Sequence, residues 1–78
     1  QSIPKQPGVL GIDVGTSGMK MVFYDFEGNE ILSTREEYPT YHPYPGWIEQ
    51  SPEDWWNAVI HGLDTFWKRN LNPQQIVA

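Results

Sequence analysis

A glycine-rich turn after the first apolar run carries the residues of this chain that are best suited to chemistry. The segment Asp13-Val14-Gly15-Thr16-Ser17-Gly18 brings together a carboxylate, glycines and hydroxyls. Glycines lack side chains, so backbone N–H groups can approach an anion closely, and successive N–H groups in a turn form a concave anion nest. Lys20 follows and adds a positive charge.

This turn predicts a polyphosphate site. Asp13 would hold a divalent cation, directly or through water, and the cation would bridge phosphate oxygens. The segment is neither a P-loop nor a dinucleotide-binding fingerprint, because its glycines stand at 11, 15 and 18 and a strand follows instead of a helix. From the residues alone a second interpretation is open, in which this is an ordinary hairpin turn that uses glycine for its φ angles.

Short strands must position the turn. They are predicted at 9–13, 19–25 and 30–35 and would form an antiparallel three-stranded meander. Alternation in the second strand puts Met19, Met21 and Phe23 on one face. A Gly- and Asn-containing turn at 25–29 joins the second strand to the third.

A helix is predicted from Pro52 onward. Ser51 suits the N-cap position, Pro52 the first helical position, and Asp54 would complete a capping box. Asn70 would cap the C-terminal end, and residues 75–78 look like the start of a further strand. The apolar residues at helical spacing, which we expect to face the core, are Trp55, Trp56, Val59, Ile60, Leu63, Phe66 and Trp67.

Composition excludes several classes of function. The net charge of −5 is the wrong sign for a nucleic-acid binder. No apolar run approaches the ~20 residues of a membrane span, and no segment has the pattern of a signal peptide, so a cytoplasmic location is expected. There is no cysteine and hence no disulfide or thiolate metal site. Four Trp, four Tyr and three Phe argue against disorder.

Three segments resemble the FGGY carbohydrate kinases of the actin-like ATPase superfamily, a family that includes xylulokinase, gluconokinase and glycerol kinase. They are Gly11–Lys20, Tyr24–Asn29 and Pro45–Trp56, and the last is similar to the family's P-G-W-x-E-Q-x-P-E-x-W-W segment. The resemblance covers about residues 9–78. It implies an α/β domain with the ribonuclease H-like (actin-like ATPase) fold.

The resemblance also implies an activity, which is transfer of the ATP γ-phosphate to a sugar hydroxyl with Mg²⁺. Asp13 would then be the metal-side carboxylate, and Gly15, Thr16, Ser17 and Lys20 would bind the phosphates of ATP. Xylulose is the expected sugar, because Ser17-Gly18 and the Glu-Gln pair after Trp47 look more like xylulokinase than glycerol kinase. The alternatives are another ATPase of the superfamily, or a small acidic interaction module without catalysis.

The catalytic base and adenine pocket of the family are expected downstream of this sequence. We therefore expect a flexible leader at 1–8, a partial kinase N-terminal domain at 9–78, and no kinase activity from the isolated 78 residues. The expected partners are a sugar and ATP, with neither nucleic acid nor membrane, and a homodimer is left open.

An aromatic loop and a histidine on the predicted helix complete the candidates. The loop could wall a sugar pocket, but packing over the sheet and helix is the favoured interpretation; its members are Tyr38, Tyr41, His42, Tyr44 and Trp47. His61 is expected on the solvated face of the helix.

Overall fold

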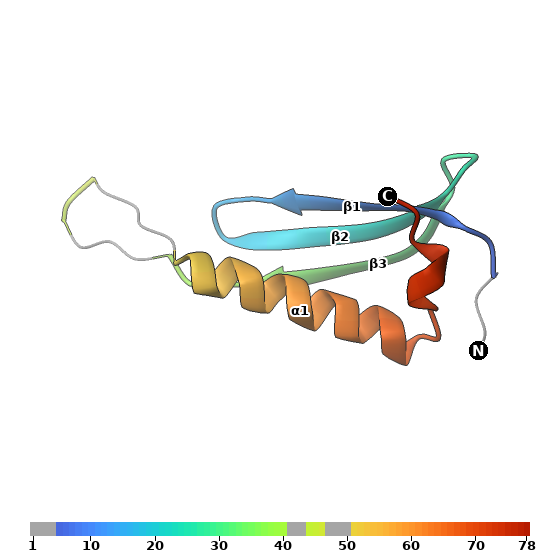
Figure 1. Ribbon diagram of the computed structural model, residues 1–78. Coiled ribbons are helices and arrows are strands. Elements are labelled where there is room, and N and C mark those ends of the chain that lie inside the picture. The colour runs from blue at the N-terminus through green and yellow to red at the C-terminus, as the bar shows by residue number, and fades with distance from the viewer. Residues whose placement is uncertain (1–4, 41–43, 47–50) are drawn as a thin grey trace.

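The computed structural model describes residues 5–40, 44–46 and 51–78. Its elements are β1 (Gly8–Val14), β2 (Gly18–Asp25), β3 (Glu30–Glu37), α1 (Pro52–Lys68) and the short 3-10 helix η1 (Pro73–Gln75). The sheet has the order β1-β2-β3 with both pairs antiparallel. Helix α1 runs along one face of this sheet (Figure 1). The predicted meander and helix are confirmed, and each strand extends one or two residues beyond its predicted limits.

The core lies between the sheet and α1. Met19, Met21 and Phe23 of β2 are at most 2% exposed, which confirms the predicted face. Leu32 of β3 and Phe66 of α1 are buried in the same cluster. Removal of these apolar side chains from water is the main force that holds the helix on the sheet.

The helix meets the sheet through smaller residues than predicted. The buried positions of α1 are Ala58, Gly62 and Phe66. Of the predicted stripe, Val59, Leu63 and Trp67 are partly buried against the core, whereas Trp55, Trp56 and Ile60 are exposed. The prediction that the whole stripe faces the core is therefore wrong for these last three residues.

Close approach of the helix backbone to β2 explains the difference. A Cβ atom added at Gly62 would lie 3.1 Å from Cε of Met21 and 3.2 Å from Cε of Met19. Small residues let the helix come this near, and the large side chains beside them are displaced toward the flanks. The glycine is thus a packing requirement of the helix–sheet contact.

Replacing Gly62 with leucine should destabilise the protein by about 1–3 kcal/mol, because the two methionines fill the space that leucine needs. Urea unfolding measures the change. Gly62→Ala is the matched control: the flexible methionine ends can shift slightly, and a gain of up to ~1 kcal/mol in helix propensity offsets that cost. Equal stability of the two variants would contradict the tight contact.

The ends of α1 agree with the prediction in part. Ser51 is the N-cap and Pro52 the first helical residue, but the Ser51 side chain makes no capping hydrogen bond. The prediction that the Ser51 side chain caps the helix is therefore wrong. Pro52 has no N–H, so the first turn of the helix has one unpaired backbone donor fewer. At the other end Asn70 adopts a φ of 72°, and its predicted capping role is confirmed.

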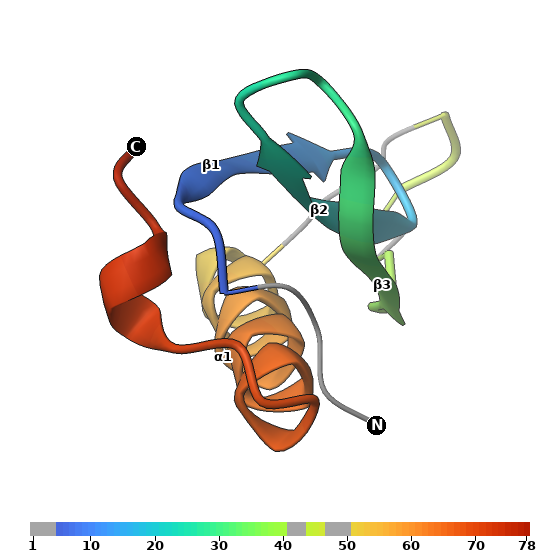
Figure 2. The ribbon, with the colours of Figure 1, turned by 90° about the vertical axis from the view of Figure 1, so that its right-hand side faces the viewer.

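The C-terminal segment lies beside β1. Ile76 forms a parallel bridge with Gly8, the Val77 amide donates to the Gly8 carbonyl at 2.9 Å, and the Leu10 amide donates to the Ala78 carbonyl at 2.9 Å. Figure 2 shows this segment along the outer edge of β1. Of the strand start predicted at 75–78, the structure has this isolated bridge at Ile76 and the hydrogen bonds beside it, but no strand, and Gln75 belongs to η1.

The leader predicted at 1–8 overlaps the start of β1 by one residue, Gly8. Gly8 is buried and is the first residue of β1, and the Gln6 carbonyl accepts a hydrogen bond of 2.8 Å from Nε2 of Gln75. Residues 1–4 lie outside the described part of the chain. Among the helices of the described part, none is long and apolar enough to cross a membrane.

Asp25 organises the turn between β2 and β3. Its carboxylate accepts hydrogen bonds of 2.9 Å from the amides of Glu27 and Asn29 and one of 3.0 Å from Nδ2 of Asn29. The side-chain hydrogen bond from Asn29, followed by the backbone donors, holds the pKa of Asp25 below its usual range. Gly28 adopts a φ of 86°, as predicted for this turn.

Candidate functional site

The Gly15–Gly18 turn joins β1 to β2 at the end of the sheet where α1 begins (Figure 1). The Gly15 amide donates to the Gly18 carbonyl at 2.8 Å, which leaves Thr16 and Ser17 exposed at the tip. This amide is thus engaged within the hairpin.

The two glycines of the turn have different reasons to be there. Positive φ angles in the described residues occur at Gly28, Gly46 and Asn70, so the interpretation that this turn uses glycine for its φ angles does not hold. A Cβ at Gly18 would lie 2.8 Å from the Glu36 carbonyl oxygen, so the packing of β3 demands glycine there. A Cβ at Gly15 would meet only the Gly18 carbonyl, at 3.5 Å. The surface over Gly15 is open enough for a ligand to approach.

A hollow of about 300 Å³ lies at this turn. All five predicted site residues line it: Asp13, Gly15, Thr16, Ser17 and Lys20. The structure thus brings together the carboxylate, the hydroxyls and the lysine that the sequence analysis singled out. The remaining lining residues are Gly18, Met19, Arg35, Glu36 and Glu37.

Three charged residues lie in a row across the strands beside the turn, one on each strand. Asp13 of β1 is opposite Lys20 of β2, and Lys20 is opposite Arg35 of β3. Directly opposed residues in antiparallel strands project to the same face, so the three form one row. Arg35 is a site residue that the sequence analysis missed. Its pairing with Lys20 depends on the register of β2 with β3, which shifts at Phe23/Tyr24 and cannot be counted from the sequence.

The charges of this row are not neutralised by ion pairs. Within the described ranges, the ion pairs are His61–Glu36 and Lys68–Asp64. Asp13 and Arg35 are exposed and Lys20 is half-buried. Among the described residues, Lys20 and Arg35 are therefore available to an anionic ligand, and Asp13 is available to a metal ion.

The residues present fit a metal ion whose ligands are one protein carboxylate, water molecules and the phosphate groups of a bound substrate. The described residues contain no cluster of three or more His, Asp, Glu or Cys side chains that could hold a metal ion by themselves. Mg²⁺ commonly takes one or two carboxylates plus water and substrate phosphates. Asp13, exposed at the rim of the hollow beside the hydroxyls, can supply one such carboxylate.

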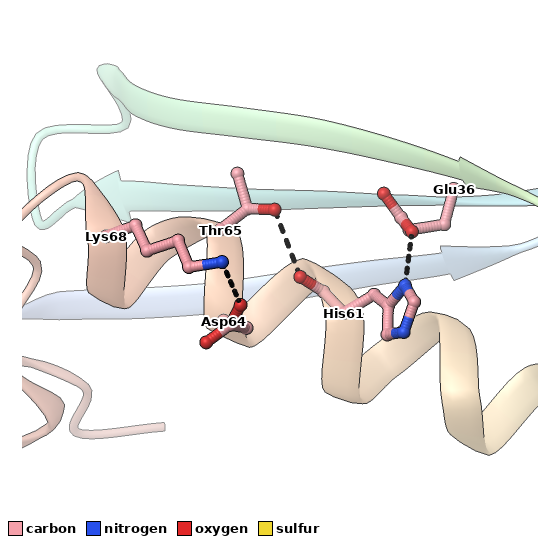
Figure 3. Close-up of polar contacts among 5 residues, drawn as sticks. All are labelled: Glu36, His61, Asp64, Thr65 and Lys68. Atoms are coloured by element: carbon pink, nitrogen blue, oxygen red, sulfur yellow. Dashed lines mark hydrogen bonds and ion pairs between the residues drawn. The ribbon is translucent and has the colours of Figure 1, made fainter.

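The side chains of His61 and Glu36 connect α1 with the end of β3. Nδ1 of His61 lies 3.4 Å from Oε1 of Glu36, as Figure 3 shows. The His61 side chain is 74% exposed, which confirms the predicted surface position, but no local pattern in the sequence indicates this partner. One turn away, Lys68 pairs with Asp64 at 2.8 Å, and the hydrogen bond and charge of Asp64 raise the pKa of Lys68.

The aromatic loop divides into different environments. Tyr38 is 8% exposed and belongs to the core cluster, in agreement with packing over the sheet and helix. Tyr44 is 64% exposed. The predictions for Tyr41, His42 and Trp47 lie outside the described residues.

Comparison with known proteins agrees with the resemblance. Residues 8–78 match the N-terminal domain of the FGGY family of carbohydrate kinases. The chain is 35% identical over 69 residues to a glycerol kinase of Pediococcus pentosaceus, covering 87% of this chain and 14% of that protein. It is 37% identical over 71 residues to a glycerol kinase of Thermococcus gammatolerans, covering 90% of this chain and 14% of that protein.

A glycerol kinase of Lactobacillus acidophilus is 36% identical over 75 residues, which cover 95% of this chain and 15% of that protein. The chain thus spans about one seventh of the length of these relatives. The matched part contains the glycine-rich turn, the sheet and α1.

Proposed function

Because the chain belongs to the FGGY family of carbohydrate kinases, we propose that it forms the nucleotide-phosphate half of a site that transfers the γ-phosphate of ATP to a hydroxyl of a polyol or sugar. The observation that carries this proposal is the hollow at the Gly15–Gly18 turn. It gathers the Asp13 carboxylate, two hydroxyls and two cationic side chains, with Glu36 and Glu37 also in its lining. Asp13, Lys20 and Arg35 have no ion-pair partner in the described part of the chain.

Each group has a role that follows from its chemistry. The hydroxyls of Thr16 and Ser17 can donate to phosphate oxygens, and Gly15 leaves room for the phosphates over the backbone. Lys20 and Arg35 offset negative charge on the polyphosphate. Phosphoryl transfer depends mostly on positioning and charge neutralisation. The hydroxyls of the turn can position the phosphates, and the cationic side chains beside it can neutralise their charge.

Asp13 is the proposed holder of Mg²⁺. A bound metal ion would supply positive charge that offsets the negative charge developing during transfer. The carboxylate of Asp13 would coordinate the ion, directly or through a water molecule, at the rim of the hollow. The base that takes the proton from the acceptor hydroxyl is proposed to lie outside these residues, so the isolated chain should not catalyse the transfer.

The acceptor is the finer question. The Ser-Gly and Glu-Gln pairs of the sequence favour xylulose, whereas the three relatives described above bear the name glycerol kinase. We place glycerol first and xylulose second, because whole-segment similarity draws on more residues than two dipeptides.

An ADP-release assay on the full-length protein tests the proposal. MgATP turnover should rise with glycerol, or else with xylulose or gluconate, and remain at background without an acceptor. A protein that binds MgADP but responds to no acceptor would be another kind of ATPase. A protein that binds no nucleotide would refute the proposal and favour an interaction module.

A further inference from the structure

Tyr38, the first residue after β3, contacts the Gly15–Gly18 turn through its backbone and its side chain. Its amide donates to the Ser17 carbonyl at 3.1 Å. Its hydroxyl donates to the Gly18 carbonyl at 2.9 Å and is also hydrogen-bonded to the Gly15 carbonyl. A phenol has one proton to donate, so the two carbonyls share it.

The ring and the hydroxyl of Tyr38 do different things. The ring belongs to the buried core cluster, and the residue is only 8% exposed. The hydroxyl reaches from this fixed position to both ends of the turn. Tyr38 does not line the 300 Å³ hollow; it borders a separate hollow with Ser17, Glu37 and Pro39. The two hollows share Ser17 and Glu37, and Tyr38 contacts the turn from outside the 300 Å³ hollow.

The contacts of Tyr38 fix the direction of the peptide groups in the turn. All peptide bonds of the described chain are trans, and in a planar trans peptide the C=O and the next N–H point in opposite directions. Holding the Gly15 carbonyl toward Tyr38 turns the Thr16 amide to the opposite side. Holding the Ser17 carbonyl turns the Gly18 amide in the same way. The orientation of the turn thus depends on a residue 20 or more positions away in sequence.

We propose that Tyr38 is a positioning residue for phosphate binding, which it serves by holding the carbonyls of the Gly15–Gly18 turn so that the other side of the turn faces the ligand. This inference rests on the proposed function, since it assigns a support to the same site. The hydroxyl acts through the turn and does not contact the nucleotide.

Tyr38→Phe is the direct test, because phenylalanine keeps the ring in the core and removes only the hydroxyl. Tyr24→Phe is the matched control: Tyr24 is half-buried in β2, and its hydroxyl makes no hydrogen bond within the described residues. Three measurements on the full-length protein are compared: MgADP affinity by calorimetry, the thermal midpoint, and amide hydrogen exchange at residues 15–18 and in α1.

The expected result is a loss of MgADP affinity of about 3- to 10-fold in Tyr38→Phe, the size of one neutral hydrogen bond, with wild-type affinity in Tyr24→Phe. Exchange should become faster at residues 15–18 and remain unchanged in α1. A merely structural role would instead lower the thermal midpoint and speed exchange throughout the chain. That pattern, or unchanged affinity and exchange in Tyr38→Phe, would overturn the inference.

The two proposals fail separately. If the wild-type protein binds no MgADP, the proposed function is refuted, and the role of Tyr38 in phosphate binding falls with it even if exchange shows that Tyr38 holds the turn. If the wild-type protein binds MgADP and Tyr38→Phe binds equally well, only the role of Tyr38 is refuted.

Discussion

Replacing Asp13 with asparagine is expected to lower kcat/KM for MgATP in the full-length protein by about 100-fold or more, the scale of losing one preorganised charge interaction at a phosphoryl-transfer site. Asparagine preserves the shape of the side chain but cannot supply the negative charge that holds a metal ion. Steady-state kinetics at several Mg²⁺ concentrations measures the change. The Mg²⁺ concentration needed for half-maximal rate should rise as well.

The stability of the Asp13 variant should hardly change. Asp13 is exposed and forms no ion pair with the described residues, and surface substitutions of this kind usually alter the free energy of unfolding by less than about 0.5 kcal/mol. Asp64→Asn is the matched control, because it removes the same charge from an exposed helix position whose only described ion pair is with Lys68. Equal kcat/KM in the two variants would show that Asp13 does not hold the metal ion.

Much of the fold was predictable because its signals are local. The apolar alternation of β2, the glycine of the β2–β3 turn and the Pro-initiated helix each depend on a few neighbouring residues. The same holds for the core of the site: Asp13, Gly15, Thr16, Ser17 and Lys20 lie within eight positions, and a single hairpin brings them to one hollow.

The parts that could not be predicted depend on contacts between distant residues. The exposed positions of Trp56 and Ile60 follow from how closely α1 approaches the methionines of β2, a distance that no helical period encodes. Arg35 joins the site through a strand register that contains an irregularity. In the sequence Tyr38 is one aromatic residue among several. Its hydrogen bonds to the Gly15–Gly18 turn exist only because the end of β3 lies against that turn.

The glycines at 15 and 18 show why a glycine in a motif needs a structure before it can be interpreted. Both fit a phosphate-binding pattern equally well in the sequence. In the structure the strand β3 presses on Gly18, since a Cβ there would meet the Glu36 carbonyl at 2.8 Å, whereas Gly15 has ordinary contact distances on its open side. Gly18 is therefore required by the packing of β3, and Gly15 is the glycine that we propose leaves room for the ligand.

Gly15→Val should accordingly lower MgATP affinity and kcat/KM by about 100-fold or more while the protein stays folded. The new side chain would occupy the space over the turn into which the phosphates must fit, and misplacement of a reacting group by even 1 Å can cost this much. Stability should be near or slightly above that of the wild type, because Gly15 has no positive φ and losing glycine restricts the unfolded chain. Calorimetric MgADP titration and thermal unfolding measure the two effects.

Gly18→Ala is the control variant for Gly15→Val, because it tests strand packing at the other glycine of the same turn. A single methyl group at Gly18 would collide with the backbone of β3, so this variant should lose about 1–3 kcal/mol of stability. The two substitutions, three residues apart in one turn, thus separate ligand space from strand packing. If Gly15→Val unfolds as readily as Gly18→Ala, or binds MgADP as tightly as the wild type, the open surface over Gly15 is not where the phosphates lie.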